Sequence, residues 1–95
     1  MSGYWIVSGR SLGDAEAAQA YAELWKPIAE RFGAVFLAGP NGHICKEGAD
    51  SERLFIVQFP SYAVAVECYE SPEYQAVLPH AARAYVRTLF IVPGC

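Results

Sequence analysis

The sequence lacks the features that mark several large classes of protein, because it has few charges, no basic cluster and no long apolar run. Charged residues make up 18% of the 95 residues, and ten acidic against seven basic side chains give a net charge of −3. Since nothing here attracts a phosphate backbone, we expect no nucleic-acid partner. The longest apolar runs have about five residues, whereas a membrane-spanning helix needs about 20. With no signal-peptide pattern at its start, the sequence predicts a soluble, cytoplasmic protein without a membrane partner.

Metal-binding and catalytic motifs are also missing. The three cysteines, Cys45, Cys68 and Cys95, have no CxxC spacing and cannot all pair within one chain, so we expect reduced thiols. His43 and Cys45 alternate along the chain, but two ligands without a third do not make a closed metal site. The sequence therefore gives no reason to expect a metal or a cofactor.

Hydrophobic residues, by contrast, are abundant and make up 54% of the chain. The length fits one compact domain over residues 1–95. A domain of this size buries only about two-thirds of the surface of its unfolded chain, so a short apolar chain leaves apolar surface exposed. We expect a partner to cover that surface.

Hydrophobic periodicity divides the chain into elements in the order β-α-β-β-α-β. Strands are predicted at residues 4–7, 34–38, 53–59 and 88–92, with a short continuation at 43–45, and helices at 15–32, 62–70 and 72–85. Asp14 and Ser71 are the expected N-caps of two of these helices, since their side chains can accept from free first-turn amides. Pro27 lacks an N–H, so we expect a kink or a break in the first helix between Trp25 and Pro27.

The order of elements indicates an α+β, ferredoxin-like fold, in which a four-stranded antiparallel sheet carries its helices on one face. Both faces of the sheet are apolar, because the strand at 53–59 alternates Leu54 and Ile56 with Phe55 and Val57. An antiparallel sheet with one wet face would alternate apolar with polar residues. We therefore expect a homodimer that forms through the open sheet face, and the sequence leaves open which of the two sets lies there.

Several short segments resemble a known family pattern. They are Gly3-Tyr4-Trp5-Ile6, Phe59-Pro60-Ser61 and the YxSPEYQ segment from Tyr69 to Gln75. The chain is similar to the DUF1330 family, a domain of unknown function in the dimeric α+β barrel superfamily, and the resemblance runs over almost its whole length. It implies a ferredoxin-like subunit whose sheet pairs with a second copy as a dimeric α+β barrel. Because this superfamily includes cofactor-free oxygenases and isomerase-like enzymes, the resemblance also implies a pocket for a small aromatic or acyl molecule.

The chain departs from that family pattern at three places. Cys68 stands where the family usually has Trp, Pro40-Asn41 stands where a Gly-Gly pair is frequent, and Ala81 stands where an Arg is common. If that Arg holds an anionic ligand in relatives, the role is lost here or has moved to His80 or Arg83.

Candidate site residues come from the aromatic rings and the few polar groups near them. The predicted ligand-binding residues are Trp5, Tyr21, Trp25, Phe36, Arg53 and Tyr69. A pocket lined by rings with polar tips is the usual form of a small-molecule site, but the same rings could simply fill the core. Arg53 is either the partner of a loop carboxylate, Asp50 or Glu52, or an anion contact at the pocket rim. His80 is the candidate catalytic acid or base, and its alternative is a surface or capping role.

Two functions from different classes follow from these residues. The first is binding of a small aromatic or acyl molecule between helices and sheet, with oxygenase-like or isomerase-like chemistry by analogy of fold. The second is a non-enzymatic module whose only activity is self-association. A cavity that touches His80 or Tyr21 favours the first, and a filled core favours the second.

Overall fold

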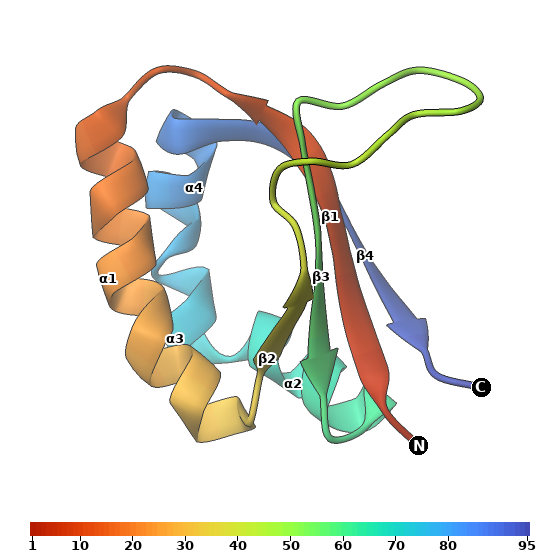
Figure 1. Cartoon of the computed structure of the whole chain (residues 1–95). Coiled ribbons are helices and arrows are strands. Elements are labelled where there is room, and N and C mark those ends of the chain that lie inside the picture. The colour runs from red at the N-terminus through yellow and green to blue at the C-terminus, as the bar shows by residue number, and fades with distance from the viewer.

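The computed structural model describes residues 1–95, and in it a four-stranded antiparallel sheet carries all of its helices on one face (Figure 1). The elements are β1 (Gly3–Ser11), α1 (Ala15–Phe32), β2 (Val35–Ala38), β3 (Arg53–Phe59), α2 (Tyr62–Glu70), α3 (Pro72–Gln75), α4 (Leu78–Ala84) and β4 (Tyr85–Pro93). The strand order is β2-β3-β1-β4 and the sheet is open. The predicted α+β, ferredoxin-like arrangement is confirmed.

The long helix α1 begins and ends where its capping residues predict. The side chain of Asp14 accepts a hydrogen bond from the backbone N–H of Ala17 at 2.9 Å. At the other end Gly33 has a φ of 67°, the left-handed conformation that lets its N–H bond to the last turn. Of the kink or break predicted between Trp25 and Pro27, the break does not occur, because α1 is continuous through Pro27. Trp25 and Ile28, on either side of Pro27, both pack on the core and hold the helix together there.

The second helical region is divided, whereas one helix was predicted over 72–85. The chain leaves helical structure between α3 and α4, and Pro79 lies in the first turn of α4. A proline fits a first helical turn but not a helix interior, where its missing N–H and its ring disrupt the preceding turn. The division therefore follows from Pro79.

Ser71 joins α2 to α3 through a buried hydroxyl. Its Oγ accepts from the N–H of Tyr74 at 3.2 Å and donates to the carbonyl of Cys68 at 2.7 Å. We expect Ser71→Ala to lower the free energy of unfolding by about 1–2 kcal/mol, as measured by urea denaturation. Ser61→Ala is the matched control. The Ser61 hydroxyl caps α2 through a single hydrogen bond, which it accepts from the N–H of Val64, so this variant should lower the free energy of unfolding by less. Equal costs for the two variants would contradict this account.

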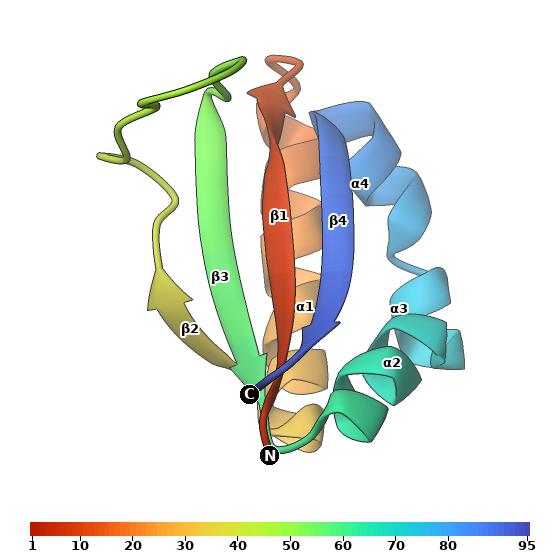
Figure 2. The ribbon, with the colours of Figure 1, turned by 90° about the vertical axis from the view of Figure 1, so that its right-hand side faces the viewer.

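The strand register decides which side chains face the helices. Trp5 of β1 lies between Val57 of β3 and Ile91 of β4, and Trp5 and Val57 are buried against α1 and α2. Ile6, the next residue along β1, points the other way and lies between Ile56 and Phe90. The open face of the sheet therefore carries Tyr4, Ile6, Leu54, Ile56, Phe90 and Val92, and Figure 2 views the sheet from this side.

Residues 39–52 form a long loop, so the strand continuation predicted at 43–45 is absent. The loop extends beyond the sheet on the side away from the helices (Figure 1). β2 ends at Ala38 after an irregularity in its pairing with β3. Gly39 then passes so close to β3 that a Cβ there would lie 2.1 Å from the carbonyl oxygen of Leu54. The carbonyl of Pro40 still accepts a hydrogen bond from the N–H of Leu54 at 3.1 Å, and beyond it residues 41–52 form no strand.

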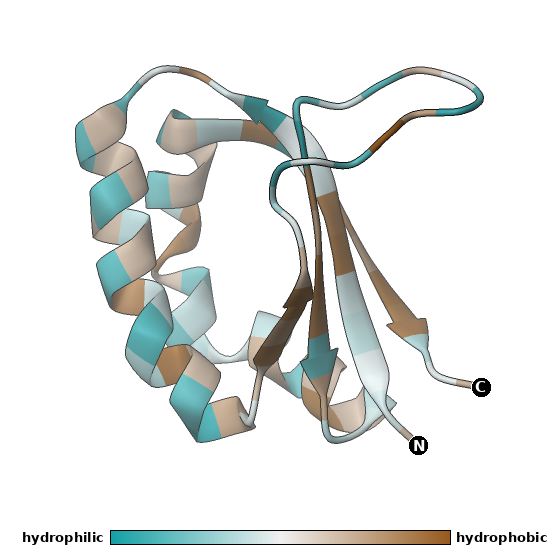
Figure 3. Ribbon diagram, viewed as in Figure 1, coloured by the Kyte–Doolittle hydropathy of each residue, from teal (hydrophilic) through white to brown (hydrophobic).

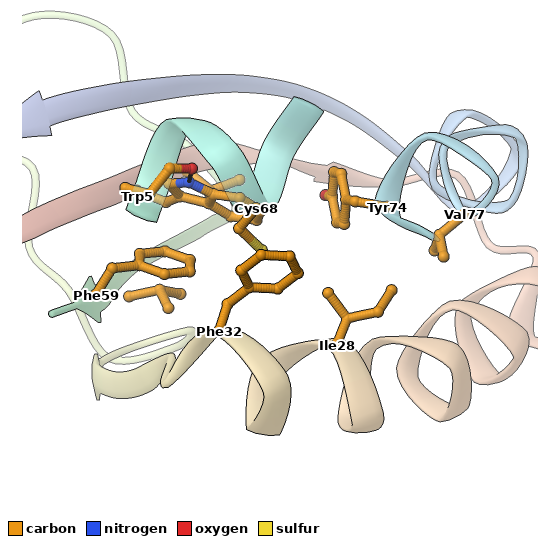
Figure 4. Packing of buried hydrophobic residues seen from close by; sticks show 10 residues of the cluster. Trp5, Ile28, Phe32, Phe59, Cys68, Tyr74 and Val77 are labelled. Carbon is orange, nitrogen blue, oxygen red and sulfur yellow. Dashed lines mark hydrogen bonds between the residues drawn. The ribbon is translucent and has the colours of Figure 1, made fainter. Parts of the chain in front are cut away.

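The core is a layer of rings between the sheet and the helices (Figure 4). Trp5 lies at its centre with 2% of its surface exposed, and its indole N–H donates to the carbonyl of Ala65 at 2.9 Å. Phe32 and Ile28 of α1 point toward it from the helix side. None of the helices is both long and apolar enough to cross a bilayer.

Candidate functional site

A cavity of about 160 Å³ lies between α1 and the helix-facing side of the sheet. α1 contributes Tyr21, Ala22 and Trp25 to its wall, and β2 contributes Phe36. The three other strands contribute the remaining lining residues, which are Trp5, Val7, Ser8, Gly9, Arg10, Arg53, Phe55, Val57, Tyr85 and Arg87. The wall is therefore mostly aromatic and aliphatic, with its polar groups near the ends of the strands.

The structure brings five of the six predicted ligand-binding residues around this one cavity, namely Trp5, Tyr21, Trp25, Phe36 and Arg53. Their spacing along the chain gives no hint of this, since they come from four different elements. The strand register explains their convergence, because Trp5, Phe36 and Arg53 all project from the helix-facing side of the sheet. That they bind a ligand remains a prediction.

Tyr69 and His80 do not line the cavity. Tyr69 packs edge-on against Trp5, with ring centroids 5.8 Å apart, and therefore supports the wall from behind. His80 lies on α4, half-buried, while the α4 side chains that face the core are those of Ala81 and Ala84. The geometry thus gives His80 no access to a ligand in this cavity.

The aromatic wall is held by ring-on-ring packing. The Trp5 ring contacts that of Trp25 at 5.4 Å, that of Phe59 at 4.9 Å and that of Tyr74 at 5.0 Å between centroids. Tilted and edge-on pairs at these distances stabilise one another beyond the burial of their surface. This packing holds the rings of Trp5 and Trp25 in the cavity wall.

Arg87 also lines the cavity, although it is not among the residues predicted from the sequence. It is half-buried, and it donates from Nη1 to the Tyr21 hydroxyl at 3.2 Å and from Nη2 to the Tyr74 hydroxyl at 2.7 Å. The two hydroxyls are themselves 2.8 Å apart. Burial, the largest cause, raises the pKa of Tyr74, so this phenol stays neutral. Its position along the chain does indicate where it points, because Arg87 lies two residues before Leu89 and four before Ile91 and therefore shares their face of β4.

Arg53 lines the cavity and does not pair with a loop carboxylate, and an anion contact by its guanidinium remains a prediction. Its guanidinium lies over the Tyr85 ring at 4.4 Å and near the Phe55 ring at 5.6 Å. Asp50 instead pairs with His43 at 3.3 Å, and Glu52 accepts from the N–H of Ser11 at 2.9 Å. A guanidinium that stacks by its face leaves its N–H edge free for another acceptor.

Cys68 is a structural thiol in the core. Burial raises its pKa from 9.0 in model compounds to about 12. Between about pH 9 and 12 the unfolded chain loses this proton and the folded chain keeps it, so the free energy of unfolding should fall as the pH rises through this window.

In the native protein at pH 8 we expect a disulfide-exchange reagent to modify the exposed Cys45 and Cys95 and spare Cys68. Rapid modification of all three thiols without denaturant would contradict this assignment.

Solved structures of similar fold extend over nearly the whole chain. A protein of unknown function from Rhodopseudomonas palustris matches 99% of this chain and 82% of its own, with a TM-score of 0.76 and 22% identity. A dimeric ferredoxin-like protein of unknown function from Thermobifida fusca matches over 99% and 92%, with a TM-score of 0.63 and 9% identity. SnoaB, a cofactor-independent oxygenase from Streptomyces nogalater, matches over 99% and 93%, with a TM-score of 0.56 and 7% identity. At these identities the likeness shows the fold alone.

No curated protein sequence matches the chain significantly. One family model does, and it covers residues 2–95, which is almost the entire sequence. The resemblance carried by the YxSPEYQ segment is thereby confirmed. The chain belongs to the DUF1330 family, a domain of unknown function.

Proposed function

We propose that this protein binds a small single-ring aromatic molecule in the cavity between α1 and the sheet. The observation that carries the proposal is the cavity itself, because a module that only self-associates needs no hollow in its aromatic core. Apolar cavities of about 150 Å³ accept a benzene-sized molecule, and this one has about 160 Å³. The site also combines apolar walls with a few polar groups, as small-molecule sites do.

The residues that line the cavity favour ligand binding over acid–base catalysis. No histidine, aspartate or glutamate lines the cavity, so no side chain there is an ordinary base at neutral pH. Its titratable groups are the phenols of Tyr21 and Tyr85 and the guanidiniums of three arginines. SnoaB, described as a cofactor-independent oxygenase, shares the fold, and this likeness does not carry its reaction to this chain.

The proposed unit is a homodimer that forms through the open sheet face. Across this face Ile56, Ile6 and Phe90 lie side by side on three neighbouring strands, and Phe90 is 57% exposed. The brown segments of β2, β3 and β4 in Figure 3 mark how apolar the strands are. No helix of this chain covers that side (Figure 2). Structural neighbours described as dimeric support pairing of this face with a second copy.

The intrinsic fluorescence of the protein offers a direct test of ligand binding. Both tryptophans of the chain line the cavity. We expect at least one of toluene, benzyl alcohol, phenol and benzoate to change the emission saturably, with a dissociation constant of about 10 μM to 1 mM for so small a ligand.

A plugged cavity supplies the control for that titration. Ala22→Phe places a ring at the cavity wall and should abolish the saturable change, whereas Ala15→Phe, on an exposed part of α1 outside the cavity, should leave it intact. Saturable binding that survives Ala22→Phe would place the ligand elsewhere. The absence of saturable binding by all four probes would overturn the proposed function.

A further inference from the structure

The charges around the cavity all have one sign. Three of the five arginines in the chain, Arg10, Arg53 and Arg87, line the cavity, and none of the ten acidic residues does. This is a marked local excess of positive charge in a protein whose net charge is −3. A concave site with cations and low-polarity walls concentrates anions.

The other two arginines show what these side chains do elsewhere in the fold. Arg83 pairs with Asp14 at 3.4 Å, and Arg31 pairs with Glu73. The three cavity arginines form no ion pair. Arg10 and Arg87 also line a second, more open hollow that contains Asp50 and Glu52. Neither carboxylate pairs with an arginine there, because Asp50 pairs with His43 and Glu52 accepts from the backbone N–H of Ser11.

Arg87 in particular has donors to spare. A guanidinium carries five N–H groups and one positive charge, and the Arg87 side chain has two hydrogen bonds, both to tyrosine hydroxyl oxygens. A half-buried charge with no counter-charge is costly to maintain. The two phenols nevertheless fix the guanidinium in one orientation beside the aromatic wall, because both hydroxyls lie within 3.2 Å of it.

Arg53 is in contact with an aromatic ring rather than with hydroxyl groups. Its guanidinium lies over the Tyr85 ring, 4.4 Å from the ring centroid, and it forms no ion pair with a carboxylate. A planar guanidinium with a free edge matches a carboxylate, which it can bind through two parallel hydrogen bonds. Two oriented guanidiniums at the polar end of an aromatic cavity therefore complement a ligand that has a ring at one end and an anion at the other.

We infer that the ligand is a single-ring aromatic acid, with its ring against Trp5 and Trp25 and its carboxylate held by Arg53 and Arg87. This inference rests on the proposed function and adds the chemical class of the ligand to it. The cavity volume of about 160 Å³ suits one ring. Arg10, which is exposed and forms no ion pair, also lines the cavity and adds to the attraction for an anion.

The first test compares two ligands of nearly equal size, one of them anionic and the other neutral. Benzoate and benzyl alcohol share the ring and differ in the anionic group. We expect benzoate to bind the protein roughly tenfold to a hundredfold more tightly in low salt, and the difference to shrink as salt is added. Equal affinities would overturn the inference and leave aromatic binding standing. Failure of both ligands to bind would overturn the proposed function as well.

The second test removes the positive charges one at a time. Arg53→Gln and Arg87→Met should each weaken benzoate binding roughly tenfold or more, and change benzyl alcohol binding less than about threefold. Arg83→Gln is the matched control, because its partner Asp14 lies outside the cavity, and it should change neither. If Arg87→Met does not fold, Arg53→Gln decides, since its side chain has no hydrogen bond to lose. Unchanged benzoate affinity in Arg53→Gln would contradict the assignment.

Discussion

Replacing Trp5 with alanine is expected to lower the free energy of unfolding by about 3–5 kcal/mol. The indole has only 2% of its surface exposed and contacts four other aromatic rings, so its removal leaves a large hole in the core. Domains of this size are stable by only about 5–15 kcal/mol in total. Urea denaturation followed by far-UV circular dichroism should therefore show a much earlier transition or an unfolded chain.

Trp5→Phe separates the two contributions of this side chain. It keeps a ring in the core but loses the buried hydrogen bond from the indole N–H to the Ala65 carbonyl. We expect a cost of about 1–3 kcal/mol, clearly below that of the alanine variant. A Trp5→Ala protein that unfolds within about 1 kcal/mol of the unmodified one would show that Trp5 is not the centre of the core.

Placing a charge on the open sheet face should convert the proposed dimer to a monomer. In a twofold-symmetric interface a substitution occurs twice, so Phe90→Lys introduces two cations into one apolar contact. Light scattering at micromolar concentration should give about twice 10.4 kDa for the unmodified protein and 10.4 kDa for the variant. Phe90 is 57% exposed in the isolated chain, so the monomer itself should tolerate the lysine.

Leu24→Lys is the control for that experiment. Leu24 is also a large exposed hydrophobic residue, at 44%, but it lies on α1, on the opposite side of the sheet from the proposed interface. We expect this variant to remain dimeric. An unmodified protein that is monomeric at micromolar concentration would refute the interface, as would a Phe90→Lys protein that still dimerises.

Much of the fold can be predicted from the sequence because local signals agree with the final packing. The caps at Asp14 and Ser71 and the apolar alternation of β3 all correspond to what forms. The two prolines show the limit. Pro27 and Pro79 have the same local effect on a helix, yet α1 continues through the first and the last helical region divides near the second. Packing on both sides of Pro27 decides the outcome, and a single sequence does not reveal that packing.

The candidate site could be predicted only in part, for a similar reason. The aromatic residues were expected to converge, and they do, but whether rings fill a core or surround a hollow depends on distances that no spacing rule gives. Arg87 escaped notice because β4 begins at Tyr85, three residues before the predicted start at Thr88. With that earlier start, Tyr85 and Arg87 fall on the same face as Leu89 and join the cavity wall.

A crystal structure of the protein grown in saturating benzoate tests the central claim most directly. The account predicts electron density for one ring beside Trp5 and Trp25, with the carboxylate oxygens about 2.7–2.9 Å from guanidinium nitrogens of Arg53 and Arg87. Benzoate density confined to the outer surface, with the space between α1 and the sheet empty or closed by side chains, would contradict it.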